Sequence, residues 1–203
     1  MLTLQDAKRH GFFNRYKKSF DKTNQVDDYN RMGFYRWLAM AVSGGGWMSD
    51  YDTMPLYSNP SDSFTLPNDG QFTSYQRHVP SLLAGDKGEW ERMARKMYDM
   101  IEKHGGKPYS DSLALNDIQR ETKRVIFDDV EVITPGQLYK DELTKSKAVR
   151  NPFSFGKTCQ KLTKWRAIHF SYAGCDEVGF CKKEREVALD KWVQAWREEC
   201  LKA

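Results

Sequence analysis

The clearest hydrophobic pattern in the chain lies between Asp86 and Gly105. Apolar side chains recur there every three or four residues, a spacing that gathers them on one face of a helix. These side chains are Trp90, Met93, Met97, Met100 and Ile101. Asp86 and Glu89 form a capping-box sequence in front of them, and Gly105-Gly106 follows where a helix would stop. The pattern predicts a helix that begins after Asp86 and ends before Gly105.

Weaker helical patterns occur in four further segments. They are residues 4–20, 28–42, 111–118 and 184–201. The first is basic and aromatic, which favours docking onto the core of the protein. The second ends at the triplet Gly44-Gly45-Gly46, which is too permissive in backbone conformation to continue a helix. The last is amphipathic and carries Trp192 and Trp196, so we predict a C-terminal helix that packs on a core.

Short apolar or alternating segments predict strands. They are residues 47–49, 72–79, 125–127, 130–133 and 165–170. Residues 53–70 are rich in Pro, Asn, Ser and Asp and predict an ordered loop. Helices and strands alternate along the chain, which is typical of an α/β fold. Without internal repeats or a long linker, we predict a single domain over residues 1–203, with a basic aromatic segment at 1–27, a core at 28–175 and a terminal helix at 183–203.

Composition limits the classes of protein that this sequence fits. The 203 residues are 39% hydrophobic and 30% charged, and no apolar stretch approaches the roughly 18 residues of a membrane helix. The N-terminus is charged from its sixth residue, unlike a signal peptide. We therefore expect no transmembrane segment in this sequence.

Charge is concentrated locally rather than spread along the chain. The net charge is only +4, but residues 140–170 hold eight basic and two acidic residues. The pI of 8.8 is low for a nucleic-acid-binding protein, so we expect no nucleic-acid partner. The basic block better fits a compact anion such as a diphosphate.

The four cysteines all lie in the last quarter of the chain. They are Cys159, Cys175, Cys181 and Cys200. Their spacing matches no pair of the kind found in structural zinc sites. We expect buried free thiols, with a Cys175–Cys181 disulfide as the alternative if the protein works in an oxidising lumen.

Two carboxylates one residue apart, Asp50 and Asp52, form the pattern with the clearest chemical use. Placed at the end of a short strand, they can face one cation, and hard divalent ions prefer oxygen ligands. So few protein ligands leave coordination positions for a substrate, which suits Mg²⁺ or Mn²⁺ bound to a diphosphate. The alternative is that the acidic pair only caps a turn.

The segment YRWLAMAVSGGGWMSDYDTMPL around this pair resembles the core of the glycosyltransferases with a DXD sugar-binding motif. That GT-A-type family includes outer-chain-initiating mannosyltransferases and capsular polysaccharide transferases. The matching residues are Arg36, Leu38, Gly45, Gly46, Trp47, Asp50 and Asp52. The resemblance implies that Arg36 helps to bind the nucleotide-sugar and that Asp52, the second Asp of the pair, holds the metal. We predict Gly45 and Gly46 as further residues of the nucleotide-sugar site and Asp50 as a second metal ligand. The chain departs from the family at Gly33-Phe34, where a Ser-Asp pair is usual.

A second segment, KWRAIHFSYAGC, resembles a late strand of the same enzymes. The resemblance implies that His169 is a further metal ligand. The basic residues that lead into it, Lys157, Lys161, Lys164 and Arg166, could balance the charge of the diphosphate, and Lys164 and Arg166 are the candidates for this role. The alternatives are a core histidine and a solvated basic face. In related proteins an Asp at the start of such a helix faces the active site, which makes Asp111 a candidate catalytic residue in contact with the acceptor. Its place at a predicted helix start fits a simple N-cap better.

The chain is short for this family. Only 49 residues precede Asp50, whereas a GT-A enzyme places its base-binding βαβ units there. We therefore expect a Rossmann-like GT-A core shortened on its N-terminal side: a fragment of a longer product, a trimmed enzyme or a relic.

The function expected is metal-dependent transfer of a sugar from a nucleotide-diphospho-sugar to a hydroxyl acceptor such as a glycan. The alternatives are a non-catalytic sugar- or nucleotide-binding module and an α/β interaction scaffold. The compartment is cytoplasmic for the sequence as written, or the Golgi lumen if an upstream anchor has been lost.

Overall fold

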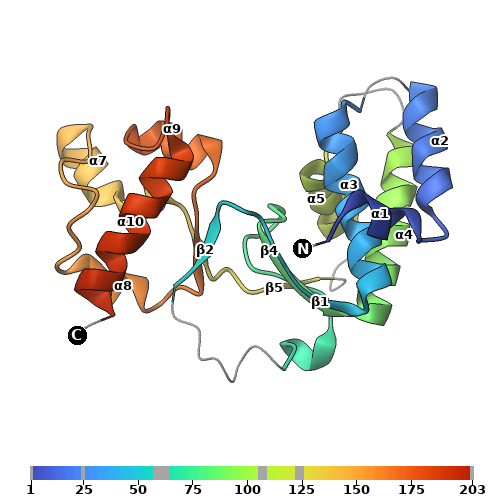
Figure 1. Ribbon diagram of the computed structural model, residues 1–203, viewed down its shortest axis with the longest axis horizontal. Helices are drawn as coiled ribbons and strands as arrows, with labels where there is room; N and C mark the ends of the chain where they lie inside the picture. The colour runs from blue at the N-terminus through green and yellow to red at the C-terminus, as the bar shows by residue number, and fades with distance from the viewer. Residues whose placement is uncertain (1, 24–25, 57–64, 105–108, 122–125, 202–203) are drawn as a thin grey trace. The chain divides into compact units, whose positions relative to one another are not determined.

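The computed structural model describes residues 2–23, 26–56, 65–104, 109–121 and 126–201 (Figure 1). The chain divides into two compact units, each assembled from two separate stretches of sequence. One comprises Met1–Ser49 and Ser63–Val130, and the other comprises Asp50–Asp62 and Glu131–Ala203. Each unit has its own hydrophobic core. The expectation of one domain over the whole chain stays a prediction.

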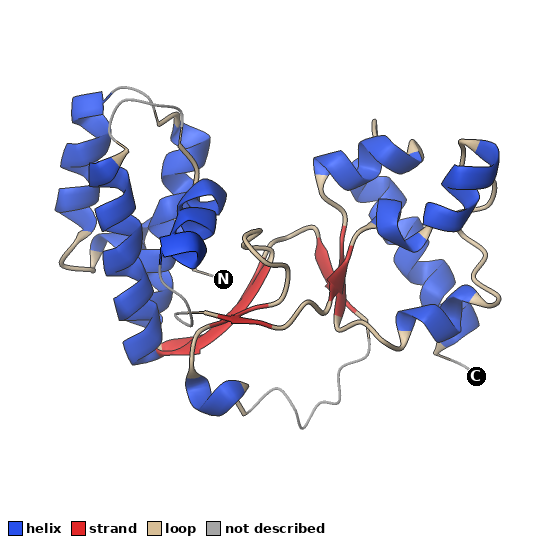
Figure 2. Ribbon diagram, turned by 180° about the vertical axis from the view of Figure 1, so that it is seen from behind, coloured by secondary structure: helices blue, strands red, loops and turns tan. Residues whose placement is uncertain are grey.

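The first unit packs helices against a small mixed sheet, as the colouring of Figure 2 shows. Its helices are α1 (Leu4–Lys8), α2 (Phe13–Thr23), α3 (Asp28–Ser43), α4 (Lys87–Lys103) and α5 (Asp111–Glu121), with a short 3₁₀ turn η2 (Asn68–Gly70). Its strands lie in the order β1 (Gly45–Ser49), β4 (Leu82–Asp86), β3 (Thr73–Ser74) and β5 (Phe127–Asp128). Strand β4 runs antiparallel to β1 and β3, and β3 runs parallel to β5.

Helices α3 and α4 confirm the two helices that the sequence predicts around them. The Asp27 side chain accepts a hydrogen bond from the Asn30 amide at 2.7 Å, and Gly44 ends α3 in the left-handed conformation. The Asp86 side chain caps α4 in the same way through the Glu89 amide at 2.8 Å. Each cap satisfies a backbone N–H that has no partner inside its helix, so these boundaries are set locally.

The core of the first unit is aromatic. Its buried large side chains include Tyr16, Phe20, Phe34, Trp37, Phe72, Trp90, Met93 and Met97. The Trp37 ring centroid lies 5.5 Å from that of Trp90 and 5.6 Å from that of Phe72. The methionines predicted on the inner face of α4 are therefore core residues.

The single helix predicted over residues 4–20 is wrong, because α1 and α2 are separated by a turn at residues 9–12. The His10 ring accepts the Phe12 amide hydrogen at 3.0 Å through Nδ1, and its Nε2 lies 2.9 Å from a carboxylate oxygen of Glu91. The His10 side chain thus accepts a backbone hydrogen bond from Phe12 that a continuous helix would make to a backbone carbonyl. The His10 ring also links this turn to α4.

The sheet of the first unit contains a strand that the sequence analysis missed. Strand β4 lies between β1 and β3, and it passes directly into α4 at Asp86. The predicted strand at 47–49 is confirmed within β1, but the one at 72–79 is only Thr73–Ser74. Of the strand predicted at 125–127, residue 125 lies outside the described residues and Phe127 belongs to β5.

The second unit surrounds a three-stranded sheet with helices. The strand order is β2 (Thr53–Pro55), β7 (Ala167–His169) and β6 (Val132–Ile133), with β2–β7 antiparallel and β6–β7 parallel. Its helices are α6 (Pro135–Leu138), α7 (Lys140–Ser146), α8 (Thr158–Leu162), α9 (Tyr172–Val178) and α10 (Arg185–Cys200). The predicted C-terminal helix is confirmed as α10, whose Trp192 is fully buried against Phe155 and Phe170.

All four cysteines are disulfide-bonded, so the expectation of free thiols is wrong. Cys159 of α8 pairs with Cys200 at the end of α10, and Cys175 of α9 pairs with Cys181. The paired Cα atoms lie 5.3 Å and 5.0 Å apart, within the range that a disulfide spans. The packing of α10 within the second unit brings Cys159 and Cys200 together. The Cys175–Cys181 bond closes a short segment at the end of α9, before α10 begins.

The α/β class predicted from the sequence is confirmed, since both units combine helices with small sheets of mixed strand direction. Within the described part of the chain, every helix is too short or too polar to cross a bilayer.

Candidate metal centre

A tight turn presents the acidic pair of the second unit. The Thr53 amide donates to the Asp50 carbonyl oxygen at 3.1 Å, which closes the turn in front of β2. Strand β2 pairs with β7 so that Thr53 lies opposite His169, and the Phe170 amide donates to the Asp52 carbonyl oxygen at 2.9 Å. Backbone pairing between two neighbouring strands therefore holds Asp52 beside His169.

Three predicted metal ligands converge at this point. Asp50, Asp52 and His169 each offer a ligand atom, and these atoms all lie within 4.8 Å of one another. The Asp52 and His169 side chains are almost fully buried, with His169 Nε2 3.4 Å from Asp52 Oδ1, and Asp50 is half-buried. Two carboxylates and one imidazole can coordinate a divalent cation and leave coordination positions for other ligands, and the identity of the metal stays a prediction. The residues present thus fit a divalent cation.

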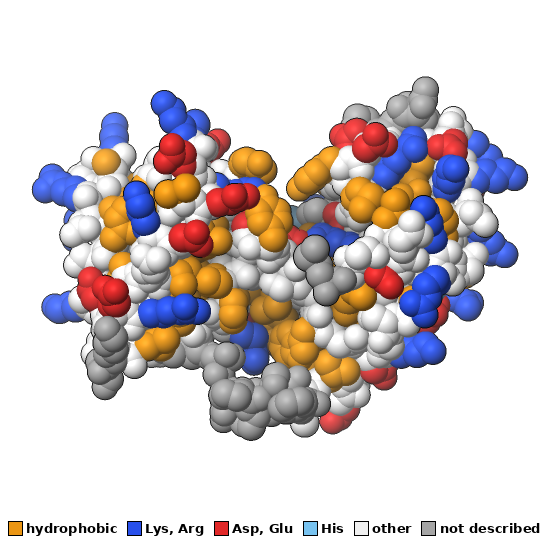
Figure 3. Space-filling view, viewed as in Figure 1, with side chains coloured by type: hydrophobic (Ala, Val, Ile, Leu, Met, Phe, Trp, Pro, Cys, Tyr) orange, Lys and Arg blue, Asp and Glu red, His pale blue; other side chains and the backbone are white. Residues whose placement is uncertain are grey.

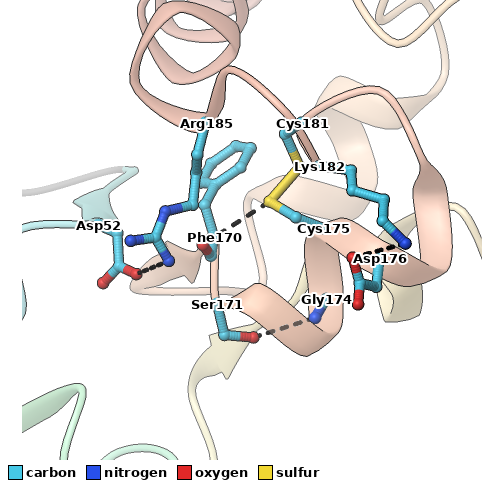
Figure 4. The surroundings of a disulfide bond; sticks show 9 residues. All are labelled: Asp52, Phe170, Ser171, Gly174, Cys175, Asp176, Cys181, Lys182 and Arg185. Atoms are coloured by element: carbon cyan, nitrogen blue, oxygen red, sulfur yellow. Dashed lines mark hydrogen bonds and ion pairs between the residues drawn. A yellow bond between two sulfur atoms is a disulfide. The ribbon is translucent and has the colours of Figure 1, made fainter.

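Arg185 contributes to this cluster and was missed by the sequence analysis. Figure 4 shows its ion pair with Asp52, in which Nη1 lies 3.0 Å from Oδ2, and its Nη2 donates to the Tyr51 hydroxyl. The guanidinium carbon lies 3.9 Å from the centroid of the Tyr172 ring. The only sequence signal for this residue is its position at the start of the predicted C-terminal helix, which says nothing of a partner so distant in the chain.

Two other predicted site residues contact each other inside the first unit. Arg36 on α3 places Nε and Nη2 at 3.1 and 2.8 Å from Oδ2 of Asp111, the first residue of α5. The Trp37 indole N–H donates to the same oxygen at 3.2 Å, and Asp111 is buried. A Cβ atom on Gly33 would lie 3.3 Å from this carboxylate. The glycine that departs from the family pattern thus leaves room for Asp111.

We expect Asp111→Asn to destabilise the first unit by about 2 kcal/mol, because it leaves the partly buried Arg36 charge without its carboxylate. Urea unfolding followed by tryptophan fluorescence measures this loss. Asp99→Asn on the exposed side of α4 is the matched control and should change stability by less than about 0.5 kcal/mol. Equal stability of the two variants would contradict a stabilising role of the Arg36–Asp111 pair.

The predicted glycines of the nucleotide-sugar site lie at the start of β1. Gly45 has φ +84°, and a Cβ atom there would lie 2.6 Å from the backbone of Asp86 and Lys87. The Gly46 carbonyl accepts a hydrogen bond from the Trp90 indole at 3.1 Å. Close approach of the β4–α4 junction accounts for glycine at position 45, and a role of either glycine toward a nucleotide-sugar stays a prediction.

The basic block at residues 140–170 is partly neutralised by its neighbours. Arg166 places Nε 2.6 Å from Oε2 of Glu131, while Lys164 is exposed. Lys161 donates to Asp141 at 2.9 Å, and this hydrogen bond lowers the pKa of the Asp141 carboxyl. On the face drawn in Figure 3, Lys and Arg side chains are scattered among Asp and Glu. A role of Lys164 or Arg166 toward a diphosphate stays a prediction.

Comparison with known proteins identifies no relative of this chain. No protein-family model, curated protein or solved structure matches the chain.

Proposed function

We propose that this protein binds Mn²⁺ or Mg²⁺ through Asp50, Asp52 and His169 and, with it, a nucleotide-diphospho-sugar. The sugar would pass to a hydroxyl acceptor such as a glycan, as in the glycosyltransferases that the DXD segment resembles. Under this proposal the α/β fold is a GT-A-type core.

The observation that carries the proposal is the convergence of the three ligands within 4.8 Å. Asp52 and His169 lie 117 positions apart in the sequence, and the β2–β7 pairing places them side by side. A cation held there supplies positive charge that stabilises a departing nucleoside diphosphate. The protein's own residues orient that charge, since the burial of Asp52 and His169 limits their movement.

The disulfides support an oxidising compartment for this activity. Cys159–Cys200 and Cys175–Cys181 both lie in the unit that holds the candidate metal site. Disulfides persist in secretory lumens and outside cells, and are rare in reducing cytosol. We therefore favour the lumenal alternative over a cytoplasmic one.

The test is release of nucleoside diphosphate from a panel of UDP- and GDP-sugars incubated with the full chain and Mn²⁺. We expect release with at least one donor and its loss on addition of EDTA, with recovery when Mn²⁺ is restored in excess. Mn²⁺ at about 100 times its Kd should also stabilise the fold by roughly 2.7 kcal/mol, measured as a rise in Tm.

The remaining outcomes distinguish the alternatives. Mn²⁺-dependent binding of a nucleotide-sugar without release would indicate the non-catalytic binding module. A Tm that neither Mn²⁺ nor nucleotide changes would contradict both the glycosyltransferase and the binding module. The interaction scaffold would then remain.

A further inference from the structure

We infer that Arg185 makes cation binding at Asp52 depend on a diphosphate ligand, an inference that rests on the proposed metal site. Arg185 is paired with one of the carboxylates that would hold the metal. Nη1 lies 3.0 Å from Asp52 Oδ2, while Oδ1 of the same carboxylate lies 3.4 Å from His169 Nε2. Both oxygens of Asp52 therefore already have partners in the protein.

The Arg185 side chain is held in place on several sides. Its guanidinium lies over the Tyr172 ring at 3.9 Å and the Tyr51 ring at 5.2 Å, and it donates to the Tyr51 hydroxyl. Only 12% of the side chain is exposed, although both tyrosines are largely exposed. A cation–π contact with a desolvated guanidinium adds to the ion pair.

The backbone that carries Arg185 is also constrained. Arg185 is the first residue of α10, and the Cys175–Cys181 disulfide closes the segment just before it (Figure 4). The Cys175 side chain lies 3.7 Å from the carbonyl oxygen of Phe170, the residue that follows His169. A cation entering the site would therefore meet a positive charge that cannot move far away.

The charges of the contacting groups give the sign of the effect. Asp50, Asp52 and Arg185 together carry a net charge of −1 when His169 is neutral, so a divalent cation makes the cluster +1. Repulsion between the metal and Arg185 should weaken binding of the metal alone, on the order of tenfold for a partly screened pair.

A diphosphate would reverse this penalty. Its negative charge neutralises the cation and Arg185 together, and a planar guanidinium forms paired hydrogen bonds to phosphate oxygens. Binding is reciprocal, so a diphosphate that favours the metal-loaded site must raise the affinity for the metal by the same factor. The site thus favours joint binding of cation and diphosphate over either one alone.

The experiment compares Mn²⁺ alone with the preformed Mn²⁺–pyrophosphate complex by isothermal titration calorimetry. We expect Arg185→Gln to bind Mn²⁺ alone about tenfold more tightly than the unmodified chain and the complex about tenfold more weakly. Arg185→Lys keeps the charge but loses the planar fork, so it should weaken binding of the complex without tightening that of Mn²⁺. Lys183→Gln, an exposed neighbour, removes the same charge and should leave both affinities within about twofold.

The result of this experiment separates the two proposals. If no protein in the series binds Mn²⁺ in either form, the metal site itself is wrong. If the unmodified chain binds Mn²⁺ but Arg185→Gln binds it no more tightly, the metal site stands and the role of Arg185 is overturned. Should Arg185→Gln fail to fold, an Arg185→Lys variant with undiminished affinity for the complex would contradict the role.

Discussion

Asp52→Asn is expected to weaken Mn²⁺ binding at least roughly 100-fold and to abolish Mn²⁺-dependent release of nucleoside diphosphate. Asp52 is almost fully buried, and both of its carboxylate oxygens lie within 3.4 Å of another site residue. Asparagine keeps the shape but removes the charge and one anionic ligand atom. Calorimetry with Mn²⁺ measures the affinity, and the nucleotide-sugar assay measures the release.

Asp176→Asn provides the matched control for this substitution. Asp176 is an exposed carboxylate of α9 in the same unit, and its Oδ1 lies 3.4 Å from the Lys182 ammonium. Its loss should leave Mn²⁺ affinity within about twofold, because an exposed ion pair contributes little and lies outside the ligand cluster. Mn²⁺ affinity that survives Asp52→Asn unchanged, in a variant whose circular dichroism spectrum is native, would remove Asp52 from the metal site.

Cys159→Ser together with Cys200→Ser is expected to lower the free energy of unfolding of the second unit by about 4 kcal/mol. The bond joins positions 41 residues apart, so its removal frees a long loop in the unfolded chain. It also releases the end of α10 from α8, while Trp192 and Trp196 of α10 remain in the core. Urea unfolding followed by tryptophan fluorescence measures the change.

The second disulfide gives a control of the same chemistry. Cys175→Ser with Cys181→Ser opens a loop with a sequence separation of only 6, and the loss expected is about 2 kcal/mol. A larger loss for this short loop than for Cys159–Cys200 would contradict the loop-entropy argument. Full stability of both double variants would show that neither bond holds the second core together.

Helices α3 and α4 illustrate what local patterns predict reliably. Their caps at Asp27 and Asp86 bond to amides three residues away, and the Gly44 turn is likewise local. Such signals require no knowledge of the rest of the fold. The break between α1 and α2 is different, since the His10 ring that favours it also contacts Glu91 on a distant helix.

The sheets show where local patterns fail. Strand β4 is only Leu82–Asp86 and passes directly into α4, so neither length nor a turn signal separates it in the sequence. Its identity as the strand between β1 and β3 comes from backbone pairing with both. Pairing partners of short strands are chosen by tertiary packing rather than by residue type.

The candidate site divides in the same way. Asp50 and Asp52 stand out in the sequence because two carboxylates one residue apart suit a hard cation. His169 was implied only by resemblance, and Arg185 by nothing beyond the start of a helix. Pairing of β2 with β7 brings His169 to Asp52, and the packing of α10 brings Arg185 to it.

By itself, therefore, the sequence determined the α/β class, the long helices with their caps, and the acidic pair at the end of a short strand. These follow from residue periodicity and from contacts within a few positions along the chain. Only the tertiary structure decided the two units, the position of β4, the two disulfides and the grouping of Asp50, Asp52, His169 and Arg185. Apart from the Cys175–Cys181 bond, each of these depends on residues far apart in sequence, whose contact is set by how two hydrophobic cores bury their side chains.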